Sequence, residues 1–145
     1  MYPDRAVASS DWDVFVRFSD NGGVTWSPEA EVSDEGAVTA YQFFPAISLA
    51  QDGMVGVSFY DTRDDQPAHE KTHRYISISV DGGVTWSANE RLSTAQPDGS
   101  GLGDPNDYGD YGGTDAGPTG RFHNIWTDSR PAANAEDTVN ALARP

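Results

Sequence analysis

The residues best suited to chemistry gather in one polar segment of the chain, 94–115. Its candidate side chains are Asp104, Asn106, Asp107, Tyr108, Asp110 and Tyr111. The oxygens of Asp104, Asn106 and Asp107 suit calcium, a hard cation that takes about six to eight oxygen ligands, although their spacing is not that of an EF-hand loop. The two tyrosines suit the stacking of sugar rings, with carboxylates binding the hydroxyls. The alternatives without a ligand are a solvated acidic loop in place of the calcium site, and two tyrosines that pack a glycine-rich loop in place of the sugar site.

Two further arginines end a repeated motif. Asp61-Thr62-Arg63 and Asp128-Ser129-Arg130 lie 67 residues apart, each after a run typical of a strand. Because each arginine follows its aspartate by two residues, a structural ion pair is the favoured interpretation. Binding of a ligand by the arginines is the alternative.

A second repeat predicts two tight turns. Residues 19–26 are Ser-Asp-Asn-Gly-Gly-Val-Thr-Trp and residues 79–86 are Ser-Val-Asp-Gly-Gly-Val-Thr-Trp, 60 positions later. The glycines supply the positive φ angles of a hairpin, and the Asn21 or Asp81 side chain can accept hydrogen bonds from turn amides. We expect each tryptophan to project between neighbouring sheets. The structural residues of the two turns are Ser19, Asn21, Gly23, Thr25, Trp26, Ser79, Asp81, Gly83, Thr85 and Trp86.

Alternating apolar and polar runs predict an all-β fold. We expect strands near 13–19, 28–33, 43–49, 54–60, 74–79, 89–93, 110–116, 121–127 and 137–143, of which the last fits helical spacing nearly as well. A repeat of 60 residues suits a four-stranded antiparallel propeller blade. The chain 1–145 is then a single unit of about two blades, in which 1–33 end one blade, 34–93 form a complete blade and 94–145 form most of a further blade.

The pattern Ser-x-Asp-x-Gly-x-Thr-Trp resembles the Asp box, or bacterial neuraminidase repeat, of sialidase-like β-propellers. Both turns match it, with Asn21 in place of the aspartate in the first, and the resemblance covers nearly the whole chain. It implies a glycan as ligand or substrate and a secreted or cell-surface location, although the chain begins with no signal peptide. In this family the Asp box is a folding element away from the active site. The family's Phe/Tyr-Arg-Ile-Pro motif is absent, so we expect no complete sialidase site in one copy of the chain.

The resemblance also sorts the loops onto two faces. The Asp boxes lie on one face, and 34–42, 61–73, 94–109 and 128–136 lie on the other, where family members bind substrate. For glycoside hydrolysis the catalytic candidates are Asp110, Tyr111, Asp61 and Asp128, and the ligand-binding candidates are Tyr108, Tyr41, Arg63 and Arg130. The alternatives are a non-enzymatic carbohydrate-binding or adhesion module and a structural scaffold without a ligand.

Two blades do not close a propeller, which has about four to eight. We therefore expect either a piece of a longer propeller or self-association, for example three copies that make six blades. A lone stack would expose strand edges and the apolar faces that carry Trp26, Trp86 and Trp126.

Charge and composition argue against two classes of partner. The chain has 23 acidic and 9 basic residues, a net charge of −14, whereas nucleic acids and anionic membranes attract basic surfaces. No apolar run approaches the roughly 18 residues of a membrane helix. Cysteine is absent, so no disulfide contributes. No cofactor is required, and calcium is the one metal that the sequence suggests.

Overall fold

The protein is all-β. The structure, a computed structural model, describes residues 12–96, 112–118, 120–128 and 137–143, and within these ranges it contains nine strands and no helix. The strands are β1 (Phe15–Val16), β2 (Ala30–Glu31), β3 (Gln42–Leu49), β4 (Val55–Asp61), β5 (His73–Ser79), β6 (Glu90–Arg91), β7 (Gly113–Ala116), β8 (Phe122–Asp128) and β9 (Asp137–Ala143). Each predicted strand is present, and the segment that also fitted a helix is strand β9.

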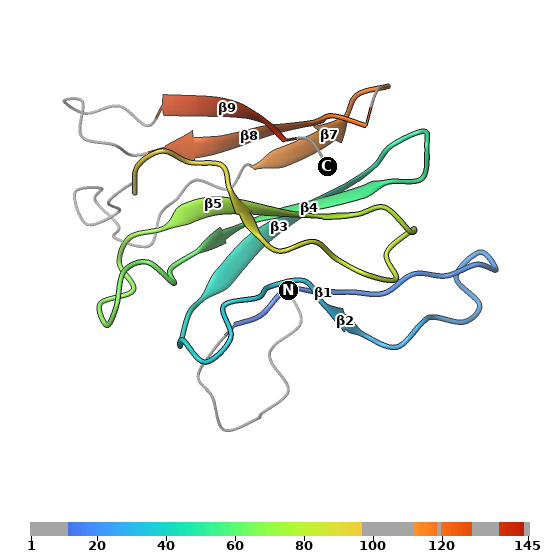
Figure 1. Ribbon diagram of the computed structural model, residues 1–145, viewed down its shortest axis with the longest axis horizontal. Coiled ribbons are helices and arrows are strands. Elements are labelled where there is room, and N and C mark those ends of the chain that lie inside the picture. The colour runs from blue at the N-terminus through green and yellow to red at the C-terminus, as the bar shows by residue number, and fades with distance from the viewer. Residues whose placement is uncertain (1–11, 97–111, 119, 129–136, 144–145) are drawn as a thin grey trace.

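The strands form three antiparallel sheets, each in the order of the chain. The sheets are β1-β2, β3-β4-β5-β6 and β7-β8-β9 (Figure 1). The short sheet packs on one face of the four-stranded sheet, where Val14 and Val32 join Val57 and Phe59 in a buried cluster. Since no strand crosses between sheets, the chain stacks one local meander after another.

The three-stranded sheet covers the opposite face of the four-stranded sheet. Phe122 and Ala143 pack there with Ile76 and Ile78 of β5. Side chains of a strand point alternately to its two faces, and here both faces are covered. Every residue of β4 and β5 is therefore buried.

Both repeated turns, 19–26 and 79–86, form the hairpins that their residues predict. In the second, Asp81 Oδ1 accepts hydrogen bonds from the backbone N–H of Thr85 at 2.8 Å and from Ser79 Oγ at 2.8 Å. Ser79 Oγ in turn accepts a bond from the Gly83 N–H at 2.7 Å. The hydrogen bonds from Thr85 and Ser79 lower the pKa of Asp81 to about 2, because they favour its charged form. Asn21 takes the same role in the first box.

The tryptophans depart from the expected pattern. Trp26 is 59% exposed and does not fill the space between sheets, whereas Trp86 is partly buried against the cluster of Val14 and Val57. Trp126 was expected on an exposed face, but it is 1% exposed and packs against Tyr60. The β7-β8-β9 sheet buries it against the four-stranded sheet, so the expectation for Trp126 was wrong.

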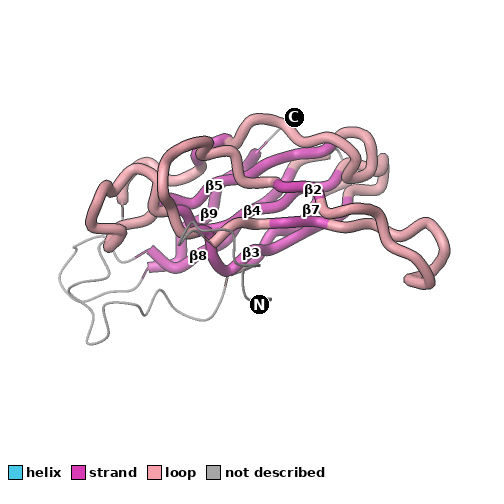
Figure 2. Tube along the Cα trace, turned by 90° about the horizontal axis from the view of Figure 1, so that it is seen from below, coloured by secondary structure: helices cyan, strands magenta, loops and turns pink. Residues whose placement is uncertain are grey.

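Loops lie at the two ends of the stacked sheets (Figure 2). The hairpins of the two repeated turns lie at one end together with the β3–β4 and β7–β8 turns, and segments 34–41 and 62–72 lie at the other, on the left of Figure 1. We call this second end the loop end. It carries the described loops that the sequence assigned to a ligand.

Gly56 tests the contact between the two larger sheets. A Cβ at this position would lie 2.5 Å from the Phe122 ring, closer than real Cβ contacts, so Gly56→Ala should lower the free energy of unfolding by about 1–3 kcal/mol. The measurement is urea unfolding followed by tryptophan fluorescence.

Gly117→Ala is the matched control, because a Cβ there meets its nearest atoms, Arg121 O and His123 Nε2, at an ordinary 3.5 Å. Adding Phe122→Leu to Gly56→Ala should recover part of the loss. Equal effects of the two alanine substitutions would contradict the packing of these sheets.

Candidate functional site

Four of the predicted site residues are described, and all four lie at the loop end. They are Tyr41, Asp61, Arg63 and Asp128. The remaining predicted residues lie outside the described ranges: Asp104, Asn106, Asp107, Tyr108, Asp110, Tyr111 and Arg130. The calcium site predicted in 94–115 therefore stays a prediction.

Asp61 and Arg63 form the predicted structural pair at the end of β4. Asp61 is 0% exposed; its Oδ1 accepts the Arg63 backbone N–H at 2.6 Å and its Oδ2 accepts Arg63 Nε–H at 2.8 Å. Gln42 Nε2 donates a further bond to Oδ2 at 3.1 Å. A carboxylate buried and bonded in this way does not reach a substrate, so these contacts favour the structural interpretation over a catalytic one.

Arg63 also ties the short sheet to the four-stranded sheet. Its Nη1 donates to Asp34 at 2.6 Å, its Nη2 donates to Asn89 at 2.8 Å, and its guanidinium lies 4.6 Å from the centre of the Tyr75 ring. Burial lowers the pKa of Arg63, but the hydrogen bonds and charges of Asp61 and Asp34 outweigh burial and raise it above its ordinary value. All three guanidinium nitrogens already bind groups of the protein, which favours the structural interpretation of Arg63 over the predicted ligand-binding role.

Asp128 ends β8 as Asp61 ends β4. It is 1% exposed and pairs in register with Asp137 of β9. Its burial gives it no more access to a substrate than Asp61 has.

A Ser-His-Asp arrangement at the end of β5 is also structural. Ser93 Oγ lies 2.7 Å from His73 Nδ1, and His73 Nε2 lies 3.8 Å from Asp64. Ser93 is 3% exposed, however, and its oxygen accepts the Arg74 backbone N–H at 3.0 Å. A nucleophile needs access to its substrate, so this arrangement is not a catalytic triad.

Tyr41 belongs to an aromatic group on the surface of the loop end. Its ring lies 5.4 Å from the ring of Trp12 and 4.9 Å from that of His69. Trp12 is 52% exposed, and its backbone oxygen accepts the Gln42 N–H at 2.7 Å. The Tyr41 N–H donates to Thr62 Oγ1 at 2.8 Å, which fixes the backbone on both sides of the pair. We call Trp12 and Tyr41 the aromatic pair.

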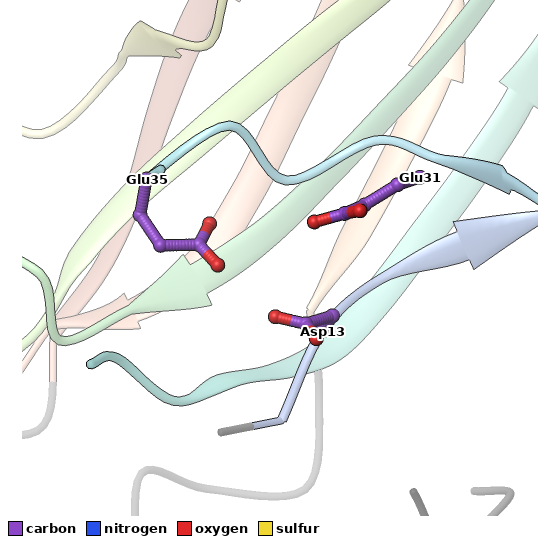
Figure 3. Close-up of side chains that lie close together, drawn as sticks. All are labelled: Asp13, Glu31 and Glu35. Atoms are coloured by element: carbon purple, nitrogen blue, oxygen red, sulfur yellow. The ribbon is translucent and has the colours of Figure 1, made fainter. Parts of the chain in front are cut away.

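Three carboxyl groups converge at the loop end of the short β1-β2 sheet. Asp13 precedes β1, Glu31 ends β2 and Glu35 follows it, and one oxygen of each lies within 4.8 Å of the others (Figure 3). We call them the carboxylate trio. Burial raises the pKa of Glu35 to about 7, Asp13 adds to the rise and Arg63 opposes it. Burial and the Asp13 charge also raise the pKa of Glu31.

The sequence predictions missed Trp12, Asp13 and Glu31. A signal exists in the 60-residue repeat, because Asp13 and Glu31 occupy the positions of His73 and Arg91 in the second copy. Acidic residues in the first copy thus replace a histidine and an arginine in the second, and this is where the two copies differ in chemistry.

The raised pKa of Glu35 predicts a dependence of stability on pH. The folded chain holds this proton up to about pH 7, whereas the unfolded chain loses it near 4.5. The free energy of unfolding should therefore fall by on the order of 2 kcal/mol as the pH rises from about 4.5 to 7. Urea unfolding across this range, in a chelating buffer, measures it.

Glu35→Gln should flatten this slope, since an amide does not titrate. Glu90→Gln, at an exposed carboxylate in β6, is the matched control and should leave the slope unchanged. If the pH dependence of the free energy of unfolding were unchanged in Glu35→Gln, it would have to arise from other groups.

Comparison with known proteins adds no assignment. No protein-family model matches this chain, and a search of curated proteins gave no match. Its chemistry has to be inferred from the aromatic pair and the carboxylate trio.

Proposed function

We propose that this chain is a glycan-binding module built from sialidase-like Asp-box blades, acting outside the cell. The observation that carries the proposal is the exposed ring of Trp12 packed beside Tyr41 at the loop end. Sugar rings present C–H faces that stack on such rings, and their hydroxyls bind nearby polar groups.

The surroundings of the aromatic pair fit a ligand with both apolar and polar parts. His69 contacts the edge of Tyr41 and lies 3.2 Å from Thr62 Oγ1. The exposed Gln66 side chain donates a hydrogen bond from Nε2 to Thr39 O at 2.6 Å. This bond joins the 62–72 loop to the segment that leads into Tyr41. An aromatic platform held on both sides by hydrogen bonds binds with little loss of conformational entropy.

The propeller arrangement belongs to the same proposal. The four-stranded sheet has the order of a blade, and both Asp boxes form hairpins at the end opposite the aromatic pair. Ile47 and Leu49 of β3 are more than half exposed, which supports completion of the fold by a longer chain or by further copies. No helix able to cross a membrane occurs in the described part of the chain.

Glycoside hydrolysis is the second candidate function. It is favoured by one observation, the pairing of Asp13 with Glu35, whose pKa is raised to about 7. Glycosidases use two carboxyl groups whose environments separate their pKa values, one as acid and the other as nucleophile or base. The Glu35 side chain is only 6% exposed, however, and an acid catalyst must reach its substrate. Glycan binding is therefore the function better supported.

Substitution of Trp12 tests glycan binding. A panel of sialylated and neutral oligosaccharides is first screened for the ligand that binds best. Calorimetry with that ligand should then show that Trp12→Ala weakens binding by about tenfold or more, because a stacked ring is lost. Trp26→Ala is the matched control: it removes an equally exposed indole at the opposite end and should leave the affinity unchanged.

An assay with fluorogenic glycosides of the same sugars distinguishes binding from hydrolysis. Turnover by the unmodified chain that Glu35→Gln and Asp13→Asn abolish would favour the second candidate. If no glycan binds, or if both tryptophan variants bind equally, the proposed function is wrong.

A further inference from the structure

We propose that Asp13, Glu31 and Glu35 form a calcium site that joins the short sheet at its loop end. The proposal concerns the carboxylate trio alone and holds whether or not the aromatic pair binds a glycan. It differs from the calcium site that the sequence predicted, which involves Asp104, Asn106 and Asp107.

The geometry suits one ion shared by three side chains. Calcium binds oxygens at about 2.3–2.6 Å, so two ligands of one ion lie at most about 5 Å apart. The trio offers one oxygen from each residue, all within 4.8 Å of one another. Asp13 precedes β1, Glu31 ends β2 and Glu35 follows β2, so one ion would join both strands, with water completing the coordination.

The Glu35 side chain gives independent support, because it is buried with an oxygen that has no hydrogen bond. The side chain is 6% exposed, Oε2 accepts no hydrogen bond, and the carboxyl group points toward Asp13 and Glu31 (Figure 3). The Arg63 Nη2 atom lies 3.7 Å from Oε2, which is within ion-pair range but beyond hydrogen-bond range. A buried carboxylate oxygen without a hydrogen bond is costly, and a cation in the trio would satisfy it.

The charge around Arg63 leads to the same conclusion. This guanidinium already binds Asp61 and Asp34 at 2.7 and 2.6 Å. Its +1 charge faces those two carboxylates and the trio, which together carry −5 once Glu35 is ionised, above its pKa of about 7. Among the described residues of this region the sum is then −4, from −5 and +1, so a divalent cation reduces the repulsion.

The second copy of the repeat shows how such a position is neutralised by side chains. There, His73 and Arg91 stand at the positions of Asp13 and Glu31, and each lies 3.8 Å from the Asp64 carboxylate. The positive charge comes from Arg91, because burial and the Arg91 charge lower the pKa of His73. In the first copy both positions are acidic. A protein cation serves one copy, and we infer that a bound cation serves the other.

The ligand chemistry selects calcium among common cations. The trio offers only carboxylate oxygens, whereas zinc favours histidine and cysteine. Magnesium demands near-ideal octahedral geometry and keeps most of its waters, whereas calcium accepts several carboxylates on segments of irregular backbone.

Metal titration of the whole chain tests the site without any glycan. Terbium, a luminescent substitute for calcium, should show saturable emission sensitised by the adjacent Trp12, and calcium should displace it. Calorimetry should give one calcium per chain and weaker binding of magnesium. Asp13→Asn, Glu31→Gln and Glu35→Gln should each weaken calcium binding by about tenfold or more.

Asp20→Asn, at an exposed aspartate of the first Asp box, is the matched control and should bind calcium as the unmodified chain does. Trp12→Phe should lose the sensitised emission but keep the calcium affinity by calorimetry, which separates this site from the aromatic pair. Glu31 is exposed, so Glu31→Gln tests the site even where Glu35→Gln fails to fold. The absence of saturable calcium binding, equal affinity for magnesium, or unchanged affinity in Glu31→Gln would each overturn the proposal.

Discussion

The buried pair of Asp61 and Arg63 holds the loop end of the structure together. Asp61 is 0% exposed, and a carboxylate in that position needs the charge and hydrogen bonds that Arg63 supplies. The same guanidinium reaches Asp34 beyond β2 and Asn89 before β6, so one side chain fixes three segments. It also faces Glu35, and it therefore sets the electrostatic environment of the carboxylate trio. Removing it would leave a buried, uncompensated charge, which costs about 3–5 kcal/mol in comparable sites.

Stacking of sheets explains why polar groups lie inside this fold. Because both faces of β4 and β5 are covered, Ser58 and Arg74 are buried although their side chains are polar. Arg74 donates to Ser58 Oγ at 2.8 Å and to Phe44 O at 3.2 Å, and lies 4.8 Å from the centre of the Tyr60 ring. Burial lowers its pKa to about 10, so it remains charged at neutral pH. Ser58 bonds in turn to Thr114 of β7, so a polar chain joins the two larger sheets.

Features that depend on near neighbours in the chain could be predicted from the sequence. Alternation of apolar and polar residues predicted the strands, and the glycines with Asp81 predicted the hairpin. The two-residue spacing predicted the Asp61–Arg63 pair. Features that depend on distant neighbours could not. Trp126 is buried because a sheet far away in the chain packs on it, and the trio forms because the chain returns Glu31 and Glu35 to Asp13. Neither contact has a local pattern.

The same distinction explains why the two copies of the repeat agree at one end and differ at the other. The hairpin of each repeated turn closes through hydrogen bonds between residues two to four positions apart, so its residues are dictated by the turn itself. At the loop end, the residue at each position depends on the segment that packs beside it. There Trp12 stands where the second copy has the buried Thr72, and Asp13 stands where it has His73. The turn chemistry preserves the fold in both copies, while the loop end of the first is free to carry the aromatic and acidic groups for which we propose binding.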